Sequence, residues 1–251
     1  FGEYRGKKCF DIEEVCVQTN TMSYDAYLRC RRFSFLVEVL SFKFFDPMRR
    51  YLLEIGVGYY DLLRTIHQEF ESNRSTKELS RIYEDFSRES EAELFESRDS
   101  IQSFFDDPTN YERLLRGELG DNLLRKYSTI MLARYLDQLV EYCYDLIFSS
   151  FGDKIDDKHL AAGSAVKNWI KSSQFLTEFV LEDRKQWQTD KVIKLSHDVP
   201  TWLKNVGVPL AEFSGELKYR LRSRSKELDN ELVSLYGESK EYQVGKVFHT
   251  R

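Results

Sequence analysis

Several residue types that commonly build reactive sites or interrupt a chain are scarce here. The 251 residues include only four cysteines, four histidines, four prolines and 12 glycines. No two cysteines lie within three residues of each other, although zinc and iron–sulfur sites usually draw closely spaced thiolates that converge on a small centre. We therefore expect no metal site in this chain and four reduced, buried or half-buried thiols, with a Cys9–Cys16 pairing across a hairpin as the alternative.

Long apolar runs and an excess of basic residues are also missing. No stretch of about 18 apolar residues occurs, so we expect no membrane-spanning segment and no membrane partner. The chain has 37 basic and 42 acidic residues, a net charge of −5, and a protein that coats nucleic acid would usually be basic. The first residue is Phe1, and no signal-peptide pattern follows it. We expect a cytoplasmic protein without a nucleic-acid partner, and a chain that is a piece of a longer one.

The familiar catalytic patterns are absent as well. There is no glycine loop for phosphate, no His-Glu-x-x-His and no nucleophile elbow, and the histidines lie far apart in the sequence. Asp106-Asp107 has no second aspartate pair at helical spacing, which favours a loop cap over the magnesium–diphosphate site of a helical isoprenoid-type synthase. The residues alone therefore indicate no catalytic, cofactor-binding or metal-binding side chain.

Regularly spaced apolar residues dominate what is present. Hydrophobic residues make up 41% of the chain, enough for a real core, and they recur every three or four positions. This pattern predicts a mainly α fold, a multi-helix orthogonal array. We expect helices from Ser23 to about Phe44 and at 48–55, 59–70, 76–105, 122–149 and 198–205. Another helix should run from Asp156 or Asp157 to about Leu181. Two more are expected, a short one that follows the break at 106–110 and reaches Leu119, and one that includes Leu228 and ends at Gly237. The stripe over 122–149 is the strongest and predicts the central core helix.

The two ends of the chain predict extended structure. Residues 1–22 are expected to form an extended or β segment, with a turn at Arg5–Lys7 and a strand over Glu14–Thr19. Residues 23–251 form the helical domain in this prediction. Near the C-terminus, Leu217, Tyr219 and Leu221 alternate with basic residues, which predicts one half-buried strand. The basic stripe there favours the outer face of an edge strand, where charge blocks unwanted pairing, over anion or RNA binding.

The densest polar patch lies between Thr19 and Arg32. It places threonines, a serine and arginines where a predicted strand passes into a helix. In α/β folds, ligands bind beyond the carboxyl ends of strands, and arginine can hold a carboxylate or phosphate with two hydrogen bonds. The simpler interpretation, which the residues alone favour, is that Ser23 caps the helix and the arginines pair with Asp25 or Glu38.

This patch also carries a resemblance to a known family. The run Glu14–Arg29, EVCVQTNTMSYDAYLR, resembles the segment just after the catalytic core of cobalamin-binding-domain radical SAM enzymes. In that family a strand leads into T-x-T-M-S, then an acidic residue, an aromatic residue and a helix that bears an arginine. Shorter similarities follow at Leu53–Gly56, Tyr59–Tyr60, Trp202–Leu203 and Tyr219–Leu221.

The resemblance implies a C-terminal helical domain, joined by residues 1–22 to radical SAM and cobalamin-binding domains that this chain lacks. A [4Fe–4S] cluster, S-adenosylmethionine and cobalamin are implied for the full-length enzyme, a possible methyltransferase, and none of them for this chain. The domain alone would be catalytically inert and would cover the open end of the barrel. By position, the resemblance implies that Thr21, Tyr24, Arg29 and Arg32 line the substrate pocket.

A second hypothesis needs no missing domain. Residues 69–107 contain twelve acids and five bases, and the predicted helix at 76–105 carries most of them. A solvated helix face explains this charge most simply. The alternative function is a stand-alone, all-helical protein–protein interaction module that docks a partner on this helix.

Overall fold

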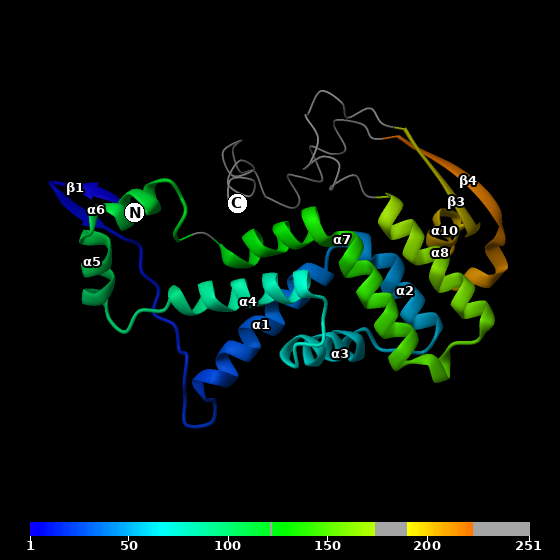
Figure 1. The fold of residues 1–251 in the computed structure, drawn as a ribbon, viewed down its shortest axis with the longest axis horizontal. Coiled ribbons are helices and arrows are strands. Elements are labelled where there is room, and N and C mark those ends of the chain that lie inside the picture. The colour runs from blue at the N-terminus through cyan, green and yellow to red at the C-terminus, as the bar shows by residue number, and fades with distance from the viewer. Residues whose placement is uncertain (121, 174–189, 223–251) are drawn as a thin grey trace.

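The computed structural model describes residues 1–120, 122–173 and 190–222. Within them the chain is mainly helical, with a short N-terminal strand pair and a second two-stranded sheet, so the predicted fold class is confirmed. Figure 1 shows an elongated molecule with the first strand pair near one end and the second at the other.

The elements follow one another closely along the chain. The α-helices are α1 (Tyr24–Leu40), α2 (Asp46–Glu54), α3 (Tyr59–Glu71), α4 (Lys77–Ala92), α5 (Arg98–Asp106), α6 (Pro108–Leu115), α7 (Leu123–Ser150), α8 (Asp157–Ser173) and α10 (Val199–Lys204). Short 3-10 helices are η1 (Lys43–Phe45), η2 (Gly152–Lys154) and η4 (Leu210–Phe213). The strands are β1 (Gly2–Tyr4), β2 (Lys7–Cys9), β3 (Asp190–His197) and β4 (Ser214–Arg222).

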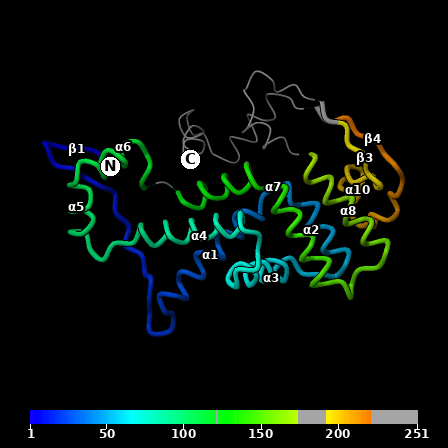
Figure 2. The backbone as a smooth tube through the Cα atoms, in the orientation of Figure 1, coloured from blue at the N-terminus to red at the C-terminus, as the bar shows by residue number. Residues whose placement is uncertain are grey.

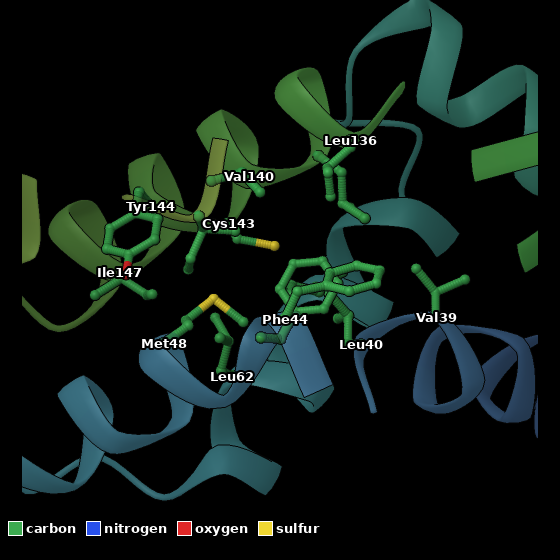
Figure 3. Close-up of a cluster of buried hydrophobic side chains, with 14 of the residues drawn as sticks. Val39, Leu40, Phe44, Met48, Leu62, Leu136, Val140, Cys143, Tyr144 and Ile147 are labelled. Carbon is green, nitrogen blue, oxygen red and sulfur yellow. The ribbon is translucent and has the colours of Figure 1, made fainter. Parts of the chain in front are cut away.

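Helix α7 is the centre of the core, as its apolar stripe predicts. It packs against α1, α3, α4 and α8. Figure 3 shows Leu136, Val140 and Cys143 of α7 facing Met48 and Leu62 across the cluster. All five side chains are essentially inaccessible to solvent, so this cluster supplies much of the hydrophobic stabilisation that holds the helices together.

Several predicted helix starts are confirmed by their caps. The side chain of Ser23 accepts a hydrogen bond from the Ala26 amide at the start of α1, and Asp198 accepts one from the Thr201 amide at the start of α10. Asp107 does the same for α6, accepting from the Thr109 amide, which is the predicted loop cap. These short polar side chains satisfy amides that the helix itself leaves without a partner.

The N-terminal strands flank the predicted turn at Arg5–Lys7. The predicted strand over Glu14–Thr19 does not form. Arg5 and Gly6 adopt positive φ angles of 50° and 75°, and the turn joins β1 to β2. The strand predicted over Glu14–Thr19 is wrong, because those residues have no regular secondary structure and pair with no strand in the part of the chain that the structure describes. A β-branched sequence forms a strand only when another strand pairs with it.

The predicted single helix at 76–105 is also wrong, since it is divided into α4 and α5. Helix α4 ends at Ala92 with Glu89, Glu91 and Glu93 around its last turn, and no basic residue lies there. Carboxylates are unfavourable at the negative end of the helix dipole. Ser97 then starts α5 through a capping box with Ser100.

The hairpin packs against α5 and α6. The Lys8 Nζ donates to the Phe105 carbonyl oxygen at 2.7 Å, and the Phe10 ring stacks on the Phe105 ring with centroids 4.7 Å apart. We call the hairpin together with α5 and α6 the N-terminal lobe. No residue of α5 is buried, so this lobe is held by a few contacts, whereas the core around α7 is held by many.

The C-terminal strand predicted around Leu217–Leu221 is confirmed as part of β4, and it pairs with a strand that the prediction lacks. Strands β3 and β4 form an antiparallel ribbon in which Ile193 lies opposite Tyr219 and Leu195 opposite Leu217. Tyr219 makes an edge contact with Trp169 of α8, at 6.0 Å between ring centroids. The remaining predicted helical residues, up to Leu181 and from Leu228 to Gly237, lie outside the described residues.

Candidate functional site

The hydroxyl groups at the junction before α1 hold a turn. The Thr19 Oγ1 accepts hydrogen bonds from the amides of Thr21 at 3.2 Å and Met22 at 3.0 Å, and the Thr19 amide donates to the Met22 carbonyl oxygen at 2.9 Å. Ser23 then caps the helix. These groups therefore shape the entry of the chain into α1 (Figure 2).

The four candidate pocket residues have different surroundings. Thr21 is exposed in the turn, and Tyr24 is 38% exposed and stacks on Tyr27. Arg29 is exposed and pairs with Asp25, with 3.3 Å between Nε and Oδ2. The structure leaves these three at the exposed start of α1 and turns Arg32 toward α3 and α4. That the four line a substrate pocket stays a prediction.

Arg32 lies at the centre of a polar network formed by side chains of three helices. Its Nε and Nη2 donate to Oε1 and Oε2 of Glu71 at 2.6 and 2.8 Å, and its Nη1 donates to the Ser87 hydroxyl at 3.3 Å. The Arg32 and Glu71 side chains are only 15% and 25% exposed. A two-point charged hydrogen bond in such partial shelter is stronger and more directional than a surface ion pair. It ties α1, α3 and α4 together.

Tyr83 extends the network to His67. The Tyr83 hydroxyl lies 2.7 Å from Glu71 Oε1 and 3.0 Å from His67 Nδ1. Burial alone would raise the pKa of Glu71, but the hydrogen bonds from Arg32 and Tyr83 outweigh it, and the pKa lies below its usual value. Glu71 is thus an ionised acceptor, and burial together with the Glu71 hydrogen bond raises the pKa of Tyr83.

Counting donors fixes the role of the His67 Nδ1 atom. The single hydroxyl proton of Tyr83 goes to the Glu71 carboxylate, so His67 must donate its Nδ1–H to the Tyr83 oxygen. The lone pair of His67 then lies on Nε2. Burial lowers the pKa of His67; the Glu71 charge opposes this, while Arg32 and Arg29 add to it. The network can therefore present one neutral, oriented imidazole, whose ring meets Phe33 edge-on at 5.3 Å.

Sequence reasoning finds Arg32 but misses its three partners. Glu71 lies in the acidic stretch attributed to a solvated face, and Tyr83 is one of the apolar-stripe positions of its helix. The available signal is weak: His67 and Glu71 are four residues apart, as are Tyr83 and Ser87, so each pair shares a helix face. Nothing in one sequence says that these faces meet.

A second set of contacts joins two of the four segments with shorter family resemblance, Leu53–Gly56 and Trp202–Leu203. Glu54 accepts a hydrogen bond from Trp202 Nε1 at 2.6 Å and from the Leu210 amide at 3.1 Å. The Arg50 guanidinium lies 4.3 Å from the centroid of the Trp202 ring and donates to the Trp202 carbonyl oxygen at 2.5 Å. Helix α10 is thereby fixed on α2, and this arrangement is structural because every named polar group is satisfied.

Two further features concern metal ions and membranes. In the described ranges, no three or more His, Cys, Asp or Glu side chains gather closely enough to hold a metal ion. None of the described helices is both long and apolar enough to cross a membrane.

Comparison with known proteins yields no relative. No family model, no curated protein and no solved structure matches this chain.

Proposed function

We propose that this chain is the C-terminal helical domain of a cobalamin-binding-type radical SAM enzyme, and that it covers the substrate side of a catalytic barrel supplied by another part of the polypeptide. The observation that carries the proposal is the segment from Phe10 to Met22. It contains most of the resemblance to the family, and it enters α1 without joining the helical core.

The exposure of this segment supports a missing neighbour. Val15 is 53% exposed, Cys16 is exposed, and residues 10–22 have no helix or strand. At the start of the segment Phe10 stacks on Phe105 of α5, and beyond it Glu14 pairs with Arg98, with both of these charged side chains more than 70% exposed. A β-branched segment of this kind gains partners for its backbone if a barrel strand lies beside it.

The packing of the shorter similarities also supports the proposal. Leu53–Gly56 and Trp202–Leu203 lie far apart in sequence but meet through the Glu54–Trp202 hydrogen bond. A contact between two of the similar segments is what a shared local structure would produce. The proposed domain therefore has a defined internal frame where α2 and α10 meet.

The cysteines of this chain do not fit an iron–sulfur cluster. Cys143 is fully buried in the helical core, and Cys9, Cys16 and Cys30 are exposed on separate segments and do not form a metal-binding group among the described residues. The proposal accordingly places the cluster, S-adenosylmethionine and cobalamin in the other domains. The role left for this chain is to shape and cover the pocket.

The test is reconstitution of the gene product that includes the upstream reading frame. We expect a Cys-x-x-x-Cys-x-x-Cys loop upstream, and formation of 5′-deoxyadenosine from S-adenosylmethionine after loading with iron and sulfide and addition of a reductant. The matched controls are the same protein with the loop cysteines changed to alanine and the isolated 251-residue chain, both expected to be inactive. A cluster-loaded protein that forms no 5′-deoxyadenosine, or a reading frame with no such loop, contradicts the proposal.

A stand-alone interaction module is the second candidate. It is favoured by the exposed carboxylates on α4, including Glu78, Glu84 and Glu91, which form no ion pair among the described residues. An independent start codon directly before this domain, together with a partner whose binding is lost when these three residues are changed to glutamine, would support it over the enzyme-domain proposal.

A further inference from the structure

The β3–β4 ribbon places two like charges directly opposite each other. Lys194 of β3 lies opposite Lys218 of β4, and both side chains are exposed. Neither forms an ion pair with a carboxylate of the described residues. Like charges that face each other across two strands destabilise a sheet. The pair therefore works against the stability of the ribbon unless a negative group lies over it.

Among the described residues, strand β4 also has an open edge. Its neighbour β3 packs against α8, whereas the main contact of β4 is β3 itself. In Figure 1, β4 is the outer of the two strands at its end of the molecule, and no described strand pairs with its other side. The strand extends over nine residues without proline. A strand edge of this length leaves a row of amide and carbonyl groups that another strand can use.

We propose that the open edge of β4 binds an extended acidic segment of a partner protein, which adds to the ribbon as a third strand. The main chain of that segment would pair with β4, and its alternate side chains would place carboxylates beside Lys218 and near Lys194. Main-chain pairing supplies affinity in such complexes, and alternate side chains supply specificity. The same lysines disfavour an apolar strand, so they select the partner as well as attract it.

The face of the ribbon fits a polypeptide better than single-stranded RNA. Its outward side chains are Val192, Lys194, Ser196, Glu216, Lys218 and Arg220, and none of these is aromatic. The nearby ring of Tyr219 is directed to the other side, against Trp169. Proteins that bind single strands without sequence preference combine basic grooves with rings on which bases stack. This face offers charge and a backbone edge without such rings.

The proposal is tested with the full chain and a fluorescent strand-length peptide of alternating glutamate and threonine. We expect a saturable rise in anisotropy that weakens as salt increases, together with slower hydrogen exchange at β4 amides. A peptide of the same charge with proline at alternate positions, and one with lysine in place of glutamate, are expected not to bind. Equal binding of the proline peptide, binding and β4 protection by an RNA oligonucleotide instead, or no binding of the acidic peptide would each overturn the proposal.

The decisive variant is Lys194→Glu, because binding and stability should change in opposite directions. It creates a Glu–Lys pair across the strands, so the ribbon should unfold at higher denaturant concentration, while affinity for the acidic peptide falls about tenfold, equivalent to 1.4 kcal/mol. Lys77→Glu makes the same charge change at an exposed site in the first turn of α4, distant from the ribbon, and should leave affinity unchanged. Loss of binding in both variants, or unchanged binding in Lys194→Glu, contradicts the proposal.

Discussion

At the scale of single residues, two arginines of α1 are alike in sequence and different in energetic importance. Arg29 and Arg32 both face carboxylates, but the Arg29–Asp25 pair is more than half exposed, and the Arg32–Glu71 pair is largely sheltered. Exposed pairs contribute little because water and salt screen them. The sequence shows two arginines one turn apart and contains nothing that separates these roles.

We expect Arg32→Gln to lower the free energy of unfolding by about 2 kcal/mol, because it leaves Glu71 partly buried without its charged partner. Arg29→Gln is the matched control, and its effect should be at most about 0.5 kcal/mol. Urea unfolding followed by circular dichroism measures both. Equal effects of the two variants would contradict the assigned importance of the network.

His67 makes stability depend on pH in a defined direction. Its folded pKa lies below the ordinary 6.5, so below pH 6.5 the unfolded chain binds more protons at this site than the folded chain does. Stability should therefore fall as the pH drops from 6.5 toward the folded pKa. His197, whose pKa is also lowered by burial, acts in the same direction.

His67→Gln should flatten part of this slope, which can be measured by urea unfolding at a series of pH values. Changing His159 to glutamine is the control, since that histidine lies on α8 outside the network. A slope below pH 6.5 that is unchanged in His67→Gln would show that another group causes it.

At the scale of elements, sequence patterns predict helices and their caps well because the information is local. Ser23 and Asp198 start helices where a short polar side chain precedes an apolar stripe. Pairing between strands is not local. The strand assigned to Glu14–Thr19 lacks a partner, and β3 is recognised only once β4 lies beside it. The division between α4 and α5 also depends on a few charges at a helix end, which a periodicity count ignores.

Helix α8 contains a glycine whose role depends on packing. A Cβ atom on Gly163 would lie 2.6 Å from the Tyr51 hydroxyl oxygen and 3.1 Å from an atom of the Phe148 ring. Tyr51 cannot easily retreat, because it is buried and donates to the His159 carbonyl oxygen at 2.9 Å. The missing side chain thus allows α2 and α8 to approach each other closely.

We expect Gly163→Ala to destabilise the protein by about 1–3 kcal/mol, although alanine favours a helix by about 1 kcal/mol over glycine. Ser164→Ala, at the neighbouring position of α8, should change stability by no more than about 0.5 kcal/mol. Thermal unfolding compares the two variants. A more stable Gly163→Ala protein would mean that the two helices separate without penalty.

At the scale of the whole molecule, the N-terminal hairpin with α5 and the core around α7 differ in how firmly they are held. The hairpin and α5 depend on Phe10, Lys8 and a few rings, while α7 is buried against four helices. Regions with few buried contacts open more readily than the core.

Phe10→Ala should therefore accelerate hydrogen exchange in β1, β2 and α5 and leave exchange in α7 unchanged. Tyr4→Ala is the control, because the Tyr4 side chain is 66% exposed and its loss should not loosen the lobe. Faster exchange throughout α7 in Phe10→Ala would show that the lobe and the core unfold as one unit.

The burial of Cys143 makes the labelling rate of its thiol a measure of how fast the core opens. Cys9, Cys16 and Cys30 are exposed, whereas burial raises the pKa of Cys143 to about 12 and shields its sulfur among the side chains in Figure 3. Alkylation needs an accessible thiolate. With iodoacetamide we expect three labels to add quickly and the fourth to add only as fast as the core opens, so intact mass against time reports the opening rate directly. Rapid addition of all four labels to the native protein would refute this expectation.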